Sequence, residues 1–127
     1  MKETKLTREY TVTEDMLAVN MGSGSVRVLA TPMVVALFEG TAAELIQNEL
    51  AEGITTVGSK IMVEHLCPTA LGVKVAVTAE LAEENGRVFR FALEAKDNAG
   101  VIATGTHERV SVKKESFAAK AEARKLQ

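Results

Sequence analysis

The longest apolar pattern in the chain has the period of an α-helix. Between residues 31 and 46 one stripe at helical spacing contains Val34, Val35, Phe38, Ala42, Leu45 and Ile46. Ala30-Thr31-Pro32 places a hydroxyl residue at the N-cap and proline at the first helical position, and Gly53 is a common C-terminal stop. We therefore predict a helix from Thr31 to about Glu52. Further apolar residues on its other side, such as Leu37, indicate that this helix is buried.

After Gly53 the apolar residues recur at every second position, which is the period of a β-strand. Strands are predicted near residues 55–66, 74–83, 87–96 and 101–113, and an earlier one over residues 7–13. Turn-forming residues join consecutive strands, and Asn85-Gly86 suits a type I′ hairpin. Such strands are antiparallel, so the pattern predicts an α+β domain in which a curved antiparallel sheet wraps around one long central helix.

Two segments lie outside this pattern. Residues 14–30 contain Gly22-Ser23-Gly24-Ser25, which predicts a mobile connection that could act as a lid over a pocket. Residues 113–127 read as a peripheral C-terminal tail, either a short helix or a frayed end. Lys113-Lys114 at its start is either a solvated basic stretch or a site that attracts the phosphates of a CoA-like ligand.

Composition limits the classes of function. The 127 residues fit one domain, and 15 basic against 17 acidic residues give no indication of nucleic-acid binding. The single cysteine, Cys67, excludes an intrachain disulfide, and two histidines make a zinc site improbable, so we expect no metal. We find neither a secretion signal nor a membrane-spanning stretch, and expect a cytoplasmic protein with no membrane partner.

Glu39 is the first candidate for chemistry, because it falls on the apolar stripe of the predicted helix. A buried ionised carboxylate is costly unless it is paired and hydrogen-bonded, so this position favours a functional group. The alternative is a glutamate at the edge of the stripe whose tip bends back to water.

His65 and Thr31 could complete a site with Glu39. The period of two puts His65 on the face of Ile61 and Val63, where a core histidine bonded to a backbone carbonyl is the simpler interpretation. Thr31 could merely cap the helix. Together, however, a hydroxyl, an imidazole and a carboxylate on adjacent elements form a constellation for acyl transfer.

These residues resemble those of a known family. The run Ala30-Thr31-Pro32, Glu39 eight positions after the threonine, Gly58, residues 64–69 and residues 105–109 are similar to hotdog-fold acyl-CoA thioesterases related to fluoroacetyl-CoA thioesterase. The resemblance implies the hotdog fold, a homodimer and a catalytic triad of Thr31, Glu39 and His65. It also implies substrate-binding roles for Gly58 and Arg109, although Arg109 could equally be an exposed strand arginine.

The expected activity is hydrolysis of a short-chain acyl-CoA thioester, with no cofactor because CoA is part of the substrate. Glu39 either activates water or assists Thr31 as nucleophile, and the sequence leaves both routes open. A non-hydrolytic acyl-CoA-binding protein and a hydratase-type lyase are the alternatives. The family's fluoroacetyl-specific enzyme carries phenylalanines before its threonine, whereas residues 20–27 here contain no aromatic residue, so we do not extend the fluorine selectivity to this chain.

Overall fold

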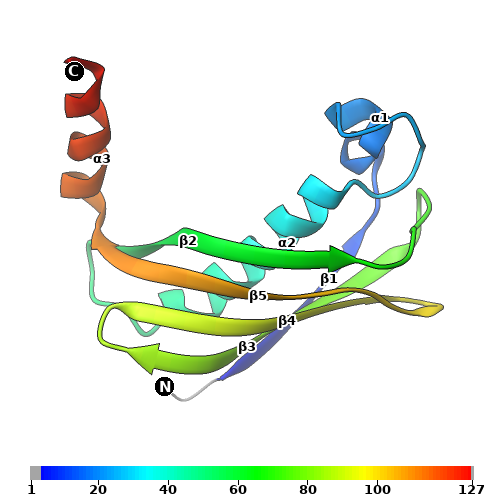
Figure 1. Cartoon of the computed structure of the whole chain (residues 1–127). Coiled ribbons are helices and arrows are strands. Elements are labelled where there is room, and N and C mark those ends of the chain that lie inside the picture. The colour runs from blue at the N-terminus through cyan, green and yellow to red at the C-terminus, as the bar shows by residue number, and fades with distance from the viewer. Residues whose placement is uncertain (1–3, 127) are drawn as a thin grey trace.

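A computed structural model describes residues 4–126, and the largest element of the fold is one five-stranded antiparallel sheet (Figure 1). The strands run in the order β1-β3-β4-β5-β2 across the sheet. Their bounds are β1 Lys5–Thr11, β2 Ile54–His65, β3 Lys74–Asn85, β4 Val88–Asp97 and β5 Gly100–Lys113. The long helix α2, Thr31–Gln47, lies against the sheet, so the predicted α+β arrangement is confirmed.

The core lies between α2 and the sheet. Phe38 and Ile46 of α2 are fully buried, as are Phe91 of β4 and Ile102 of β5. The buried side of α2 includes Leu37 and Thr41, so its centre is rotated toward them relative to the predicted stripe. Glu39 therefore lies at the flank of the buried side that faces β2, and not at its centre.

The start of α2 differs from the prediction in a way that matters for Thr31. Ala30 is the N-cap, Thr31 is the first helical residue, and no side chain caps the helix. At the other end the helix stops at Gln47 instead of near Glu52, because bonds from Glu49 and Leu50 to carbonyls three residues earlier tighten the chain. The capping role considered for Thr31 is therefore absent, and its hydroxyl is available for another partner.

The segment before α2 has more structure than a mobile connection would. It contains a 3₁₀ turn, η1 (Glu14–Met16), and a short helix, α1 (Ala18–Met21), and a bridge joins Leu17 to Leu29. Both leucines are buried, which fixes the two ends of the segment and leaves residues 22–27 exposed between them. Figure 1 shows this segment above one end of the sheet.

The turn between β3 and β4 also differs from the predicted type. Asn85 pairs with Val88, so Gly86 and Arg87 form the two-residue loop, and only Gly86 has a positive φ, of 62°. A type I′ turn needs positive φ at both central residues, whereas a glycine at the first position alone is the requirement of type II′.

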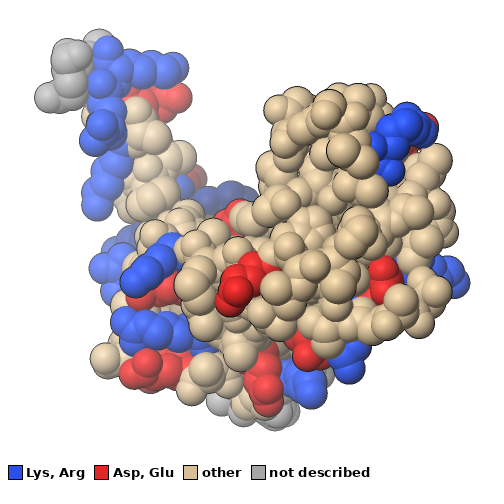
Figure 2. All heavy atoms as spheres, turned by 45° about the vertical axis from the view of Figure 1, so that its right-hand side comes forward, with Lys and Arg blue, Asp and Glu red and all other residues tan. Residues whose placement is uncertain are grey.

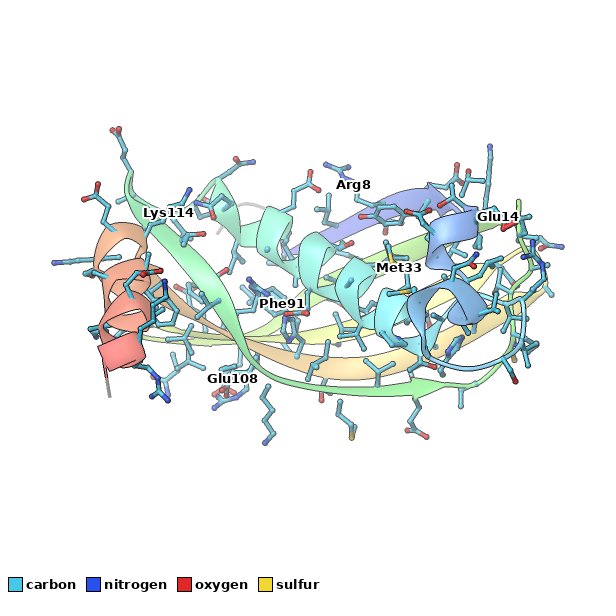
Figure 3. The ribbon with its side chains drawn as sticks, turned by 90° about the horizontal axis from the view of Figure 1, so that it is seen from above. Arg8, Glu14, Met33, Phe91, Glu108 and Lys114 are labelled. Carbon is cyan, nitrogen blue, oxygen red and sulfur yellow. The ribbon has the colours of Figure 1, made fainter. Side chains whose placement is uncertain are left out.

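The C-terminal end forms a helix, α3 (Lys114–Ala123), and a 3₁₀ turn, η2 (Arg124–Leu126). No residue of α3 is buried, and the helix stands away from the sheet at the end opposite α1 (Figure 1). Seen from above, Lys114 at its base and Glu14 lie at opposite ends of the molecule (Figure 3). No helix in the described part of the chain is long and apolar enough to cross a membrane.

Candidate active site

Thr31 and His65 meet at the N-terminal end of α2. The Thr31 hydroxyl lies 2.8 Å from Nδ1 of His65, within hydrogen-bond distance. Both residues line a pocket of about 320 Å³ whose other walls come from the segment before α2 and from the chain just after β2. These walls include Ser23, Gly24, Val26, Leu66, Cys67 and Pro68. The segment predicted as a lid therefore does border the pocket that contains the two residues.

The environment of His65 favours its neutral form. Burial lowers the pKa of His65, and a backbone contact with Cys67 opposes that shift in part. Its Nε2 atom is buried and has no hydrogen-bond partner among the described residues. A neutral imidazole that holds a hydroxyl at Nδ1 can accept the hydroxyl proton, which is the first requirement of a general base.

Glu39 belongs to a second group of residues, further along α2. Its side chain is 42% exposed, so the predicted burial of this carboxylate on the core face is wrong. Its Oε2 atom lies 3.6 Å from Nη1 of Arg109, whose side chain is only 9% exposed. The buried charge of the pair is thus the arginine, and Glu39 lies between that arginine and solvent.

Gly58 lets the Glu39 carboxylate approach β2. A Cβ atom added at Gly58 would lie 2.6 Å from Oε2 of Glu39, which is closer than any side chain tolerates. The register between β2 and β5 shifts between Gly58 and Lys60, so Ser59 is the extra residue of a β-bulge. Because of this bulge, Gly58 shares the helix-facing side of the sheet with Ile61 and His65, which strict alternation would forbid.

Arg109 is held by two neighbours that sequence analysis did not select, Thr56 and His107. Its Nε donates to the Thr56 hydroxyl at 2.9 Å and its Nη2 to the Thr56 carbonyl at 3.0 Å. Nη1 lies 3.2 Å from Nε2 of His107, whose Nδ1 lies 2.8 Å from the carbonyl of Lys60. A neutral His107 that donates from Nδ1 and accepts at Nε2 satisfies both contacts.

The electrostatics of this second group follow from burial. Burial lowers the pKa of His107 first, and the charge of Arg109 lowers it further. Burial also lowers the pKa of Arg109, against the opposing effect of Glu39.

The alternating pattern of His107 and Arg109 on β5 was a signal that could have identified this group. Arg109 is a buried arginine rather than an exposed strand arginine.

The structure therefore divides the five predicted site residues into two groups. Thr31 and His65 form one, and Glu39, Gly58 and Arg109 form the other. Thr31 and Glu39 are eight residues apart on one helix, which corresponds to roughly 12 Å along its axis. No hydrogen bond or ion pair within residues 4–126 joins the two groups. The first group offers a nucleophile and a base, and the second a carboxylate beside a fixed cation.

Comparisons with known proteins identify the family of this chain. Residues 12–115 match the family described as fluoroacetyl-CoA-specific thioesterase. A fluoroacetyl-CoA thioesterase from Streptantibioticus cattleyicolor is 37% identical over 93 residues, which cover 73% of this chain and 67% of that protein.

Solved structures share the fold of this chain. A variant of the fluoroacetyl-CoA-specific thioesterase FlK in complex with fluoroacetate and CoA superposes with a TM-score of 0.85 at 28% identity, over 89% of this chain and 95% of the other. A hot-dog-like protein from Thermanaerovibrio acidaminovorans superposes with a TM-score of 0.87 at 25% identity, over 95% and 90%. The predicted hotdog fold and thioester-hydrolase class are thereby confirmed, and the chain belongs to the fluoroacetyl-CoA-specific thioesterase family.

Proposed function

We propose that the protein hydrolyses a short-chain acyl-CoA thioester to the free acid and CoA, with Thr31, Glu39 and His65 as catalytic residues. The observation that carries this proposal is the 2.8 Å contact between the Thr31 hydroxyl and His65 inside a small pocket. A pocket of about 320 Å³ suits a small acyl group. Such chemistry requires no cofactor, since CoA is part of the substrate, and an acyl-CoA substrate fits a cytoplasmic enzyme.

Two routes are consistent with the site. In the first, the Thr31 hydroxyl attacks the thioester carbonyl, His65 accepts its proton at Nδ1 and passes it to the departing thiolate, and Glu39 activates the water that releases the acid. In the second, Glu39 takes a proton from water that attacks the thioester directly, while Thr31 and His65 hold the carbonyl. A burst of free thiol in the first turnover would identify the acyl-threonine route.

We further propose a homodimer in which β2 pairs with β2 of a second copy. β2 is an edge strand of 12 residues, and a long unpaired edge is a liability that proteins normally cover. Antiparallel pairing about a two-fold axis at Met62 would place Ile61 opposite Val63 of the partner subunit. The bulge at Ser59 would then bring Gly58 opposite His65 of the partner subunit. The dimer would thus join Glu39 of one chain to the Thr31–His65 pair of the other, and complete the site.

The test is release of free thiol from a panel of acyl-CoA esters, followed with a thiol reagent. Hydrolysis of short-chain esters supports the proposal. Binding without release of thiol would indicate a non-hydrolytic protein, and hydration of an enoyl ester without thiol release would indicate a lyase.

The lid segment bears on the choice of acyl group. Residues 20–27 supply no aromatic ring to the pocket, so we expect no large preference for fluoroacetyl-CoA over acetyl-CoA. A ratio of kcat/KM values of roughly a thousandfold or more, which is about 4 kcal/mol in the transition state, would contradict this expectation.

A further inference from the structure

His107 of β5 is a buried titratable residue that takes no part in the proposed reaction. Its neighbour Glu108 points to the other face of the sheet, where it pairs with Arg90. Charged residues of that kind lie at the surface, and acidic and basic side chains are intermixed in the lower part of Figure 2. His107 is only 4% exposed, so its two ring nitrogens depend on partners within the protein. Those partners show what the residue does.

The two ring nitrogens of His107 bond to different kinds of group. Nδ1 lies 2.8 Å from the Lys60 carbonyl, which can only accept, so Nδ1 carries the proton. Nε2 then has a free lone pair, and it lies 3.2 Å from Nη1 of Arg109, which can only donate. The rigid ring therefore joins a carbonyl of β2 to the guanidinium on β5.

Nη1 is the nitrogen of Arg109 that faces Glu39. Thr56 holds the other two nitrogens, Nε and Nη2. Nη1 lies 3.6 Å from Oε2 of Glu39, and no other ion pair of Arg109 is found within residues 4–126. A neutral acceptor orients Nη1 without cancelling its charge, whereas a carboxylate in place of the imidazole would compete with Glu39. His107 thus directs the cation and leaves its charge for Glu39.

The three side chains of this chain of contacts meet beside Gly58. A Cβ atom added there would lie 2.6 Å from Oε2 of Glu39, 3.3 Å from Cε1 of His107 and 3.4 Å from Nη1 of Arg109. Lys60, whose carbonyl anchors the imidazole, directly follows the bulge of β2. The bulge that turns Gly58 toward Glu39 therefore also sets the anchor of His107.

We propose that His107 is a positioning residue for the hydrolysis, which acts through Arg109 by holding Nη1 where the Glu39 carboxylate meets it. It transfers no proton to or from the substrate. The kinetic consequence rests on the proposed function, because Glu39 is there the group that acts on water. The hold of His107 on Arg109 is testable without turnover.

The kinetic test uses two substitutions that separate the two ring nitrogens. Gln places its amide oxygen near the position of Nε2, and Asn places its amide nitrogen near that of Nδ1. His107→Gln keeps an acceptor for Arg109, so kcat should stay within about threefold of the parent. His107→Asn keeps only the donor to Lys60, so kcat should fall roughly tenfold with KM within about twofold. A residue that merely joined β2 to β5 would give the reverse order, which would overturn the proposal.

A control separates the polar contacts of His107 from the packing of its ring. Both variants lose the imidazole, so both should lower the melting temperature Tm by similar amounts. Phe91→Leu removes a buried ring whose centroid lies 6.1 Å from that of His107. It should also lower Tm, yet keep kcat within about threefold of the parent. A tenfold loss of kcat in Phe91→Leu, or equal kcat values in His107→Gln and His107→Asn, would contradict the proposal.

Nitrogen NMR of the Arg109 guanidinium separates failure of this proposal from failure of the proposed function. In the parent and in His107→Gln, bonds at both Nη1 and Nη2 should slow the rotation that exchanges them. His107→Asn should exchange them at least several-fold faster, because Nη1 has lost its acceptor. Unchanged exchange in His107→Asn would overturn the proposal, whatever the substrate. Faster exchange in a protein that hydrolyses no thioester would support the hold on Arg109 and contradict the proposed function instead.

Discussion

The two residue groups along α2 differ in how firmly the protein holds them. At the start of the helix, the exposed Thr31 hydroxyl makes one contact, to His65. About two turns further along α2, Glu39 faces Arg109 of β5. Arg109 is buried and is held by Thr56 and His107. The Thr31 hydroxyl can therefore change partners during a reaction, whereas Arg109 is held in place before the substrate arrives. The comparison is the basis of the proposed roles, in which the Thr31–His65 pair exchanges a proton and the Glu39 carboxylate acts beside a preorganised cation.

Glu39→Gln should cause the largest loss of turnover, because it removes the carboxylate charge while keeping the size of the side chain. We expect kcat to fall by roughly a hundredfold or more if the carboxylate activates water. The buried Arg109 would lose its counter-charge, so the free energy of unfolding should fall by about 1 kcal/mol. Glu44→Gln, on the exposed side of α2, is the matched control and should leave kcat unchanged. Parental turnover in Glu39→Gln would make the carboxylate structural.

Thr31→Ala tests the first group. Loss of the hydroxyl should lower kcat roughly tenfold to a hundredfold, whereas Thr31→Ser, which keeps it, should remain within about threefold of the parent. The hydroxyl does not cap α2, so thermal unfolding should not change. A loss of about 1 kcal/mol, the usual cost of a lost cap, would show that Thr31 serves the helix instead.

Gly58→Ala tests the close approach within the second group. The added methyl meets Oε2 of Glu39, which is the flexible end of a half-exposed side chain, so the carboxylate can move aside. We therefore expect roughly a tenfold loss of kcat/KM with little change in stability. Gly40→Ala is the control, since nothing lies within 4 Å of its added Cβ on α2. It should stabilise the helix by about 0.5–1 kcal/mol and preserve activity.

Acid should affect both groups through their histidines, and this effect is the smallest. Burial lowers the pKa values of His65 and His107 in the folded state. As the pH falls, the unfolded chain therefore binds protons at a higher pH than the folded chain does. The contribution of the two histidines to the free energy of unfolding is fully present above the ordinary histidine pKa of about 6.5, and it is lost as the pH falls through the folded-state pKa values. Activity should follow protonation of His65 over the same range. A melting temperature that rises as the pH falls from 7 to 5 would contradict this sign.

The two groups also differ in what the sequence could predict. Glu39 and His65 stood out because each polar side chain falls on a predicted apolar face, and Thr31 stood out because its hydroxyl lies at the start of the predicted helix. The face of Gly58 could not be predicted, because the bulge at Ser59 changes the alternation of β2 and depends on pairing with β5. His107 was missed for a related reason: its role appears only when Arg109 and the Lys60 carbonyl are placed beside it.

The helix and strands themselves were largely predictable, since α2 and the four later strands have strong periodicity. The end of α2 and the type of the β3–β4 turn were not. Both depend on local hydrogen bonds and φ values that tertiary packing sets. The segment before α2 was expected to be mobile, yet Leu17 and Leu29 anchor it in the core.

The central claim is that Glu39 of one chain and the Thr31–His65 pair of another form one site, and mixed dimers test it most directly. Glu39→Gln and His65→Ala proteins, each inactive alone, are unfolded together and refolded as a mixture. If the site spans the β2 edge, every mixed dimer contains one intact site, so the mixture should recover about a quarter of parental activity. If each site lies within a single chain, every site keeps one of the two substitutions, and the mixture should stay inactive. No recovery, with native mass spectrometry confirming mixed dimers, would contradict the account.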